Sequence, residues 1–433
     1  MIANLALLVL AATAPAASPR VLTLDAALAT ARTQQPTLRQ AAADTDAALA
    51  NADVAKAPLL PQVNGNATGQ RATGNFSARP GSLPGQIGGT GANLSWESFG
   101  YYNLGLSASQ LLYDFGQTSS RWRSAQAGAQ AQRNTQRSTL EQVLYGVRTA
   151  YYQARAAKGA VGVAQETLAN QDKHLQQIEG FVDVGTRPEI DLAQAKTDRA
   201  NAEVQLITAQ AGYEIAKAQL NQAIGVEAST DYDVADETAP SVEGEDGSTE
   251  VLFDEALKAR PEIAALADQV RAQELAVRSL RGALGPSVFL SAGFTDAGTQ
   301  ASNFVWNWNT AIGVSVPIFQ GGQTRAQIRQ ADANLTAVRS QAEAERLQVR
   351  FEVDQARLTV VGAKVALSAT EEALVNAQLR LKLAEGRYET GVGSIIELGD
   401  AQVALTNAAY QKVAAEYKLA QARAGLIKAL GLD

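Results

Sequence analysis

The chain has 433 residues, a formal net charge of −7 at pH 7, no cysteine and one histidine. The acidic balance argues against nucleic-acid binding, because neutralising phosphates requires an excess of Lys and Arg. Without cysteine there is no disulfide framework, no thiol nucleophile and no Cys-based zinc site. The single histidine, His174, is expected on the surface of a helix and not in a metal site, since a metal needs several ligands. We therefore expect no cofactor and no metal.

The first 17 residues are similar to a secretory signal peptide. An apolar run at 5–12 precedes Ala14-Pro15-Ala16-Ala17, a small-residue pattern that suits signal peptidase. The alternative is a short buried helix. No later stretch has the roughly 18 apolar residues that a membrane-spanning helix needs, so a membrane-embedded part would have to consist of β-strands.

The rest of the chain is an internal duplication. The segment 112–118 (LYDFGQT) matches 318–324 (IFQGGQT), and the two copies are 318 − 112 = 206 residues apart. The same offset relates Gly185 to Gly391. Upstream, the offset is 225 residues, as between Pro36 and Pro261 and between Pro61 and Pro286. We predict a first repeat at 18–225 and a second repeat at 251–433.

The two repeats differ by an insertion and are joined by an acidic segment. Between the matching prolines and glycines lie 116 − 61 = 55 positions in the first repeat and 322 − 286 = 36 in the second. The additional 55 − 36 = 19 residues fall in a stretch rich in Gly, Ser and Pro around 73–90, which predicts a surface loop. The linker at 226–250 is rich in Asp and Glu, so we expect a solvated segment and not a core element.

Each repeat is predicted to open with a helix, at 24–57 and at 251–283, that ends at proline-containing breakers. Two strands follow in each repeat, where apolar residues alternate with small or polar ones. Their predicted ranges are about 62–70 and 103–113 in the first repeat and about 286–295 and 309–318 in the second. The alternation fits a barrel wall between lipid and water, and also an ordinary half-buried sheet. Aromatic residues beside the strands favour the membrane interpretation, namely Trp96, Phe99, Tyr101, Tyr102, Trp306 and Trp308.

The longest pattern in each repeat is helical and free of proline. It covers 117–182 and 323–388, and a helix of this length would extend roughly 100 Å. Apolar residues recur at the spacing of a coiled-coil seam, at Leu335, Val338, Ala342, Val349, Val353, Ala356 and Val360. Each pattern breaks at glycine and resumes, which predicts helical hairpins at 117–225 and 323–431. Four strands cannot close a membrane barrel, which needs about eight, so several copies must contribute, and a trimer would give twelve strands.

At this point the sequence resembles the outer membrane efflux protein family typified by TolC. The resemblance is carried by 24–28 (LDAAL), by the strand-to-helix segment 110–116 (QLLYDFG) with its second copy at 316–322 (VPIFQGG), and by the tip segments 388–391 and 397–401. It covers essentially all of the chain after the signal peptide. Each motif is weak alone, whereas their order, duplication and spacing together are specific.

The resemblance implies a fold that is mainly α with a small β part. In it, duplicated repeats of two strands and a long helical hairpin form a trimeric 12-stranded outer-membrane β-barrel continued by a periplasmic α-helical barrel. The implied function is a channel in the cell outer membrane, an exit duct for efflux or type I secretion. The chain would assemble as a homotrimer and contact outer-membrane lipid. Its protein partners would be a periplasmic adaptor (membrane fusion) protein and an inner-membrane RND, ABC or MFS transporter.

The carboxylates Glu397 and Asp400 form the best acidic pair, and their i, i+3 spacing places them on one helical face. One explanation is that they oppose the dipole at a helix start. The resemblance implies another, in which three copies surround a narrow entrance with acidic rings that attract cations. Asp191, which matches Glu397 at the offset of 206, and Tyr388 occupy family positions in the contacts that restrain the closed entrance.

The family often has a basic residue where this chain has Gly393, so Arg387 or Arg187 is a candidate substitute. Glycine also ends helices in left-handed conformations, which explains the turns at the hairpin tips. The resemblance implies that these tips dock the adaptor, through Gly185, Thr186, Arg187, Gly391, Val392 and Gly393.

We assign no catalytic residue and expect no enzyme activity. Two alternatives remain open at the level of sequence. One is a periplasmic coiled-coil scaffold without a pore, which would be soluble without detergent. The other is a glycan hydrolase that uses the carboxylates, for which the repeats provide no concave site.

Overall fold

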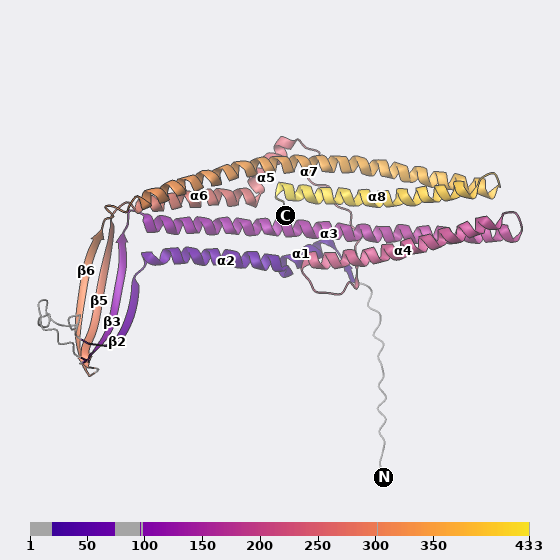
Figure 1. Ribbon diagram of the computed structural model, residues 1–433. Helices are drawn as coiled ribbons and strands as arrows, with labels where there is room; N and C mark the ends of the chain where they lie inside the picture. The colour runs from indigo at the N-terminus through magenta and orange to yellow at the C-terminus, as the bar shows by residue number, and fades with distance from the viewer. Residues whose placement is uncertain (1–19, 74–95, 97, 301, 433) are drawn as a thin grey trace, which may run out of the picture. The chain divides into compact units, whose positions relative to one another are not determined.

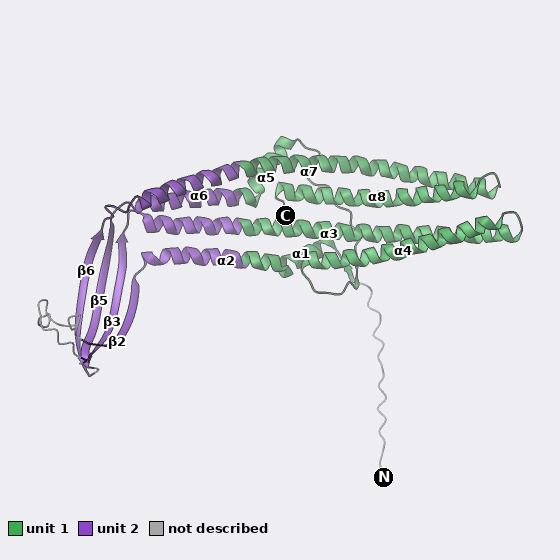
Figure 2. Cartoon of the chain, in the orientation of Figure 1, with its two compact units in different colours: residues 1–42, 135–263, 344–433 green, residues 43–134, 264–343 purple. Residues whose placement is uncertain are grey.

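The structure is a computed structural model that describes residues 20–73, 96, 98–300 and 302–432 (Figure 1). The chain divides into two compact units (Figure 2). Unit 1 comprises residues 1–42, 135–263 and 344–433, and unit 2 comprises residues 43–134 and 264–343. The expected signal peptide at 1–17 and nearly all of the loop expected around 73–90 lie outside the described residues.

The helices are α1 (Leu24–Gln34), α2 (Pro36–Lys56), the 3₁₀ turn η1 (Ala57–Leu59), α3 (Gln117–Asp183), α4 (Glu189–Ile224), α5 (Thr249–Ala259), α6 (Pro261–Gly282), α7 (Gln323–Glu389) and α8 (Ile395–Leu430). The strands are β1 (Arg20–Leu22), β2 (Gln62–Thr73), β3 (Ser98–Tyr113), β4 (Tyr232–Val234), β5 (Ser287–Gln300) and β6 (Asn303–Ser315). The described part is therefore mainly helical with a small β part, as the fold class predicted.

The internal duplication is visible in the helix lengths. Helices α3 and α7 each have 67 residues, and α4 and α8 each have 36. Both shorter helices end at a left-handed glycine, Gly225 at φ 83° and Gly431 at φ 69°. The repeat of two strands and a long helical hairpin is thus confirmed.

The opening helix of each repeat is broken, although we expected it to be continuous. The breaks lie at Gln35 and Arg260, which have ψ values of 119° and 123° and are therefore extended. Each of these residues precedes a proline, Pro36 or Pro261, whose ring clashes with a helical conformation of the residue before it. The prolines then begin α2 and α6, where their missing N–H groups cost nothing.

Unit 2 contains an antiparallel sheet with the strand order β2-β3-β5-β6. Strand β6 begins at Asn303, earlier than predicted, and it ends at Ser315, before Pro317, whose nitrogen cannot donate a hydrogen bond. As a result Trp306 and Trp308 lie within a strand and not before it. Strands β2 and β6 are the two edges of this sheet, and within the described chain neither has a second neighbour.

The two faces of this sheet differ in chemistry. The pairing Leu106↔Phe294↔Trp308 lies on one face, together with exposed Ile312 and Val314. Residues one position away along the strands point to the other face. That polar face carries amides and hydroxyls and, within the described strands, no charged side chain; among its members are Asn64, Asn66, Thr68, Asn103, Ser107, Ser109, Ser291, Thr295, Asn307 and Asn309.

Unit 1 has apolar cores where the helical hairpins meet the segment between the repeats. One core contains Leu252, Phe253, Val349, Val353, Val360, Leu426 and Leu430. Another contains Val147, Tyr151, Leu220, Ile224 and Val234. Three of the predicted seam positions, Val349, Val353 and Val360, are fully buried.

The linker 226–250 is partly a core element, contrary to our expectation. Strand β4 pairs in parallel with β1, and Val234 is fully buried. Its acidic residues are held by basic partners: the Lys158 ammonium lies 2.8 Å from Asp233, and the Arg423 guanidinium lies 3.0 Å from Glu245. Because opposite charges neutralise them, these carboxylates can lie against the helices.

No helix in the described part of the chain is both long and apolar enough to cross a membrane.

Candidate functional site at the hairpin tips

Both hairpins turn through the same glycine-based helix end. After α3, Gly185 has φ 76°, and the N–H of Thr186 donates to the carbonyl of Phe181 at 2.9 Å. After α7, Gly391 has φ 79°, and the N–H of Val392 donates to the carbonyl of Arg387 at 3.0 Å. A left-handed residue in this position satisfies the last carbonyls of a helix, and glycine adopts it without steric cost. The turns therefore have a local explanation that is independent of any partner.

A buried contact joins the two hairpins at their tips. Tyr388 on α7 is 3% exposed, and its hydroxyl donates to the carboxylate of Asp191 on α4 at 3.1 Å. Arg187, in the first turn, stacks on the Tyr388 ring at 4.2 Å and donates from Nη2 to the Tyr388 carbonyl at 2.6 Å. Phe181 packs edge-on against the same ring at 6.4 Å between centroids. We call Phe181, Arg187, Asp191 and Tyr388 the tip latch.

Burial fixes the protonation of the tyrosine in this latch. Desolvation, followed by the charge of Asp191 and the hydrogen bond to it, raises the pKa of Tyr388 to about 12. The phenol therefore stays protonated at neutral pH and remains a donor. Asp191 is itself only 7% exposed, so its carboxylate depends on this donor.

The other two candidate carboxylates lie outside the latch. The carboxylate of Glu397 is 3.1 Å from the Arg387 guanidinium, in an ion pair whose side chains are 43% and 56% exposed. Its backbone N–H donates to the Ser394 hydroxyl, which caps α8. Asp400 is exposed on α8 and makes no ion pair with another described residue. The structure thus brings Asp191 and Tyr388 together and keeps Glu397 and Asp400 on an exposed surface.

Gly393 is enclosed by the end of α7. A Cβ atom there would lie 3.0 Å from the Arg387 carbonyl carbon and from the Tyr388 nitrogen. The N–H of Gly393 also donates to the Arg387 carbonyl at 2.8 Å. A side chain at this position is thus disfavoured. Of the two candidate substitutes, Arg387 pairs with Glu397, and Arg187 contacts Tyr388 in the tip latch. Both arginines named as substitutes have charged or aromatic partners.

A second set of contacts between the hairpins was missed from the sequence. Thr167 on α3 lies 3.2 Å from Thr406 on α8, and Gln171 donates to Gln402 at 2.9 Å. Further along the same face of α3, His174 lies 3.4 Å from Glu385 on α7. The signal was the spacing of 167, 171 and 174, which places three polar residues on one helical face.

His174 is 8% exposed, so our expectation of a surface histidine was wrong. Desolvation lowers its pKa, against the opposing effect of Glu385. Within the described residues no cluster of three or more His, Asp or Glu side chains could hold a metal ion.

A groove of about 640 Å³ lies between α4 and α8 beside the latch. Amides and carboxylates line it together with apolar side chains, and the polar members include Asp191, Asp198, Gln194, Gln402 and Asp400. Exposed aliphatic side chains, Ile190 and Ile396, lie at its end near the tips. This surface of mixed polar and apolar side chains suits contact with another protein chain or with water.

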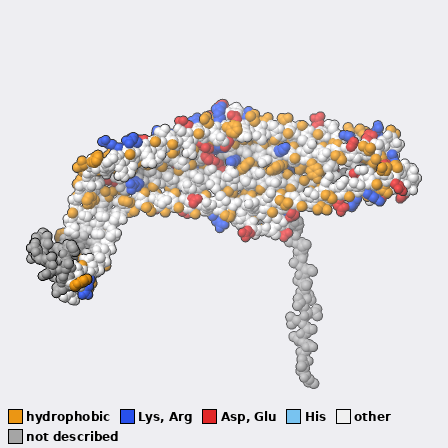
Figure 3. All heavy atoms as spheres, in the orientation of Figure 1, with side chains coloured by type: hydrophobic (Ala, Val, Ile, Leu, Met, Phe, Trp, Pro, Cys, Tyr) orange, Lys and Arg blue, Asp and Glu red, His pale blue; other side chains and the backbone are white. Residues whose placement is uncertain are grey.

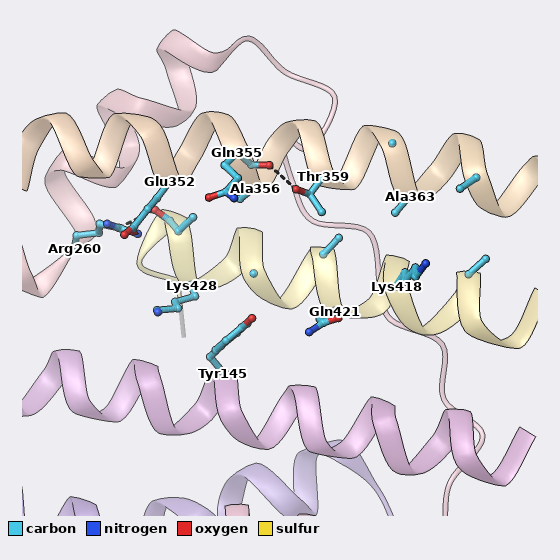
Figure 4. Close-up of a pocket in the computed structure, with 16 residues that line it drawn as sticks. Tyr145, Arg260, Glu352, Gln355, Ala356, Thr359, Ala363, Lys418, Gln421 and Lys428 are labelled. Carbon is cyan, nitrogen blue, oxygen red and sulfur yellow. Dashed lines mark hydrogen bonds and ion pairs between the residues drawn. The ribbon is translucent and has the colours of Figure 1, made fainter. Parts of the chain in front are cut away.

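A second groove, of about 560 Å³, lies on α7 and α8 and is floored by small residues such as Ala356 and Ala363 (Figure 4). Its one carboxylate, Glu352, accepts a hydrogen bond from Arg260. Burial alone would raise the pKa of Glu352, but hydrogen bonds from Gln348 and Arg260 lower it. The groove therefore presents no pair of carboxylates with separated acid and base roles, as glycoside hydrolysis requires.

Comparison with known proteins identifies the family. A family model described as "Outer membrane efflux protein" matches residues 27–226 and 252–432. The outer membrane efflux protein BepC of Brucella suis biovar 1 (strain 1330) is 26% identical over 386 residues, which are 88% of this chain and 79% of BepC. The outer membrane protein TolC of Escherichia coli (strain K12) is 26% identical over 425 residues, 93% of this chain and 80% of TolC.

Solved structures of channels share the fold. The outer-membrane channel OprN superposes with a TM-score of 0.82 at 22% identity, covering 95% of this chain and 90% of OprN. The outer membrane protein VceC of Vibrio cholerae superposes with a TM-score of 0.81 at 18% identity, covering 94% and 96% of the two chains. The family and these neighbours are channels rather than enzymes, and they remove the reason for the scaffold alternative. The chain therefore belongs to the outer membrane efflux protein family and, as the sequence resemblance predicted, is an outer-membrane efflux channel protein.

Proposed function

We propose that three copies of this chain form a passive exit duct whose periplasmic entrance is closed by the tip latch. In this proposal a periplasmic adaptor protein joins the duct to an inner-membrane RND, ABC or MFS transporter, which supplies the energy. The duct itself catalyses no reaction. The observation that carries the proposal is the buried hydrogen bond between Tyr388 and Asp191, because it links the two hairpins of one copy at their tips.

The edges of the sheet support assembly. Strands β2 and β6 would expose unpaired backbone N–H and C=O groups, which cannot remain unsatisfied in lipid. Pairing β6 of one copy with β2 of the next satisfies both edges, and three copies of four strands give the twelve strands of a closed wall. The uncharged polar face would then line the water-filled interior, and the face with Trp306 and Trp308 would contact lipid.

The latch supports gating by small movements of the hairpins. Its polar contacts join α4 and the first turn to α7, so opening requires that the hydrogen bond to Asp191 and the stacking of Arg187 be lost or replaced by water. Such a contact favours one of two discrete arrangements of packed helices. Partners that bind the tips more strongly in the open arrangement would shift the equilibrium by their difference in affinity.

Glu397 and Asp400 contribute to the charge of the entrance in this proposal. Three copies would place six carboxylates around it, of which the three from Glu397 are paired with Arg387. Asp400 is therefore the stronger contributor to cation preference. An exposed ion pair is worth at most about 1 kcal/mol, so Glu397 contributes little to closure.

The tips also provide the proposed adaptor-docking surface. Gly185, Thr186, Gly391 and Val392 are exposed, whereas Arg187 is held by Tyr388 and Gly393 is enclosed. Two valines at the turns, Val184 and Val392, are each 72% exposed. Exposed apolar side chains at the end of a hairpin suit the core of a protein interface.

The proposal is tested by measuring the mass and the planar-bilayer conductance of the detergent-extracted protein. We expect a trimer with small, cation-preferring currents, and we expect Asp400→Asn to weaken the cation preference more than Glu397→Gln does. A monomer that gives no current would contradict the assembly. A trimer whose currents are large without any partner would support the duct but contradict the closed latch.

A further inference from the structure

A band of positive charge surrounds the helix ends next to the sheet of unit 2. Seven basic side chains lie in the terminal turns of α2, α3, α6 and α7, all within about 9 Å, along the helix axis, of the helix end that adjoins the sheet. All seven are exposed: Lys56, Arg121, Arg123, Arg278, Arg281, Arg325 and Arg329. We call these residues the basic belt. Figure 3 shows blue side chains gathered over the ends of α6 and α7 next to the sheet.

The belt is positive in a chain whose formal net charge is −7. Three described carboxylates lie near it: Asp53 on α2, Asp114 just before α3, and Asp332 on α7. Asp114 is 8% exposed and accepts a hydrogen bond from the N–H of Thr118 at 2.7 Å, so its charge stabilises the N-terminus of α3. Around these helix ends, seven cations thus face three carboxylates among the described residues.

Most of the belt has no anionic partner within the described chain. Arg281 pairs with Asp332 at 3.1 Å, and Lys56 lies 5.5 Å from the centroid of the Trp122 ring. The remaining five arginines, Arg121, Arg123, Arg278, Arg325 and Arg329, make no ion pair with another described residue. Their guanidinium groups are free to bind an external anion, for which their planar forks are well suited.

The internal duplication keeps two of these positions basic in both repeats. Lys56 corresponds to Arg281, since 281 − 56 = 225, and Arg123 corresponds to Arg329, since 329 − 123 = 206. The residue beside the second pair has changed from Trp122 to Ile328. Both repeats therefore keep a basic residue at the position of Arg123 and Arg329, although the residue before it differs between the repeats.

A collar of exposed apolar residues lies where the strands of the sheet meet the helix ends that carry the belt. Ile318 and Phe319 are 94% and 88% exposed, and Leu112, Tyr113, Phe115 and Leu284 are each about half exposed. This order of an apolar collar followed by cations matches the order of hydrocarbon and headgroups at the edge of a bilayer. The headgroup layer is roughly 5–8 Å thick, which is similar to the axial extent of the belt.

We propose that the basic belt binds anionic phospholipid headgroups, in the membrane leaflet from which these helices emerge. The guanidinium groups pair with headgroup phosphates while the apolar collar contacts the acyl chains. The belt thereby fixes the depth of the sheet in the outer membrane. The inference rests on the outer-membrane location and on unit 2 alone, and it does not require the tip latch or any protein partner.

The test compares Arg121→Gln/Arg123→Gln with a matched variant of the same helix, Arg133→Gln/Arg137→Gln. Both remove two exposed arginines from α3, but the second pair begins 133 − 117 = 16 residues, or about 24 Å, from the helix start. The purified oligomers are embedded in bilayers of phosphatidylglycerol and phosphatidylethanolamine and extracted, and the lipids that remain bound are counted by native mass spectrometry.

Wild type and the matched variant should retain phosphatidylglycerol in excess over phosphatidylethanolamine. The belt variant should lose that excess about fivefold, and adding Arg325→Gln/Arg329→Gln should increase the loss to more than about tenfold. The corresponding Arg→Lys variants should keep the excess, because charge is retained. As a folding control, all variants should have the oligomer mass and melting temperature of wild type.

Equal retention by the belt and matched variants would overturn the proposal. So would loss of the excess in the Lys variants. If the lipid-free oligomer bound inorganic phosphate more tightly than phosphatidylglycerol, and the belt variant lost that binding, the site would belong to the free ion, and the assignment to a membrane surface would likewise be overturned.

Discussion

Replacing Tyr388 by Phe removes one hydroxyl from the tip latch and leaves the ring in place. The stacking of Arg187 and the packing of Phe181 are retained, whereas Asp191 loses the hydrogen bond that spans 3.1 Å. A hydrogen bond to a charged group contributes about 1.5–3 kcal/mol. If the bond exists only in the closed state, its loss should raise the ratio of open to closed channels by roughly 10- to 150-fold.

Single-channel recording in planar bilayers measures this ratio directly. Wild type, Tyr388→Phe, Asp191→Ala and the double variant form a cycle, and contacting residues should give a double variant that opens less than the two single effects combined predict. Tyr410→Phe is the matched control, because this tyrosine on α8 is partly buried but its hydroxyl makes no hydrogen bond to another described residue.

The latch account would be refuted by a Tyr388→Phe channel that opens no more often than the Tyr410→Phe channel. Full additivity of the Tyr388 and Asp191 variants would also count against it, because the two side chains would then act independently. Neither result would affect the assignment to the family, which rests on the sequence match.

Arg187→Lys should also increase opening, since a Lys side chain cannot both stack on the Tyr388 ring and maintain the bond to its carbonyl; unchanged recordings would limit the latch to the tyrosine hydroxyl. Gly393→Ala should lower the melting temperature of the hairpin tip, because the new Cβ would lie 3.0 Å from backbone atoms, and an unaltered melting curve would show that the tip relaxes freely. Burial acts to raise the pKa of Glu245, but hydrogen bonds from Arg423 and Lys364 outweigh this effect and lower the pKa to about 2. A lowered carboxyl pKa stabilises the fold above the unfolded value of about 4.5, and this stability is lost as the pH falls towards 2. Arg423→Ala should therefore flatten the acid limb of the stability curve, and an equally steep limb would contradict the pairing.

Much of the fold could be predicted because matching residues recur at a fixed offset in the two repeats. Gly185 and Gly391 end long proline-free patterns at the same offset, so the hairpins and their lengths could be predicted. Alternation along the strands predicted the sheet, although β6 extends further back because Trp306 and Trp308 continue its alternation. These features depend on residues close together in the chain, where periodicity is informative.

Features that depend on distant residues were harder to predict. Asp191 and Tyr388 came from the family resemblance, and nothing in their spacing shows that they meet across 197 residues. The burial of Val234 was missed because the acidic composition of its segment suggested solvent. Charge composition alone does not reveal that Lys158 and Arg423 on separate helices neutralise those carboxylates.

The central claim is that three copies close one wall by pairing β6 of one copy with β2 of the next. Because the chain has no cysteine, cysteines can be introduced in pairs, one at Asn64 or Asn66 and one at Asn307 or Asn309, without competing thiols. Oxidation in the outer membrane should convert at least one such pair into a covalent ring with the mass of three chains. A mass that stays at one chain for every pair would contradict the assembly, and a ladder beyond three would contradict its closure.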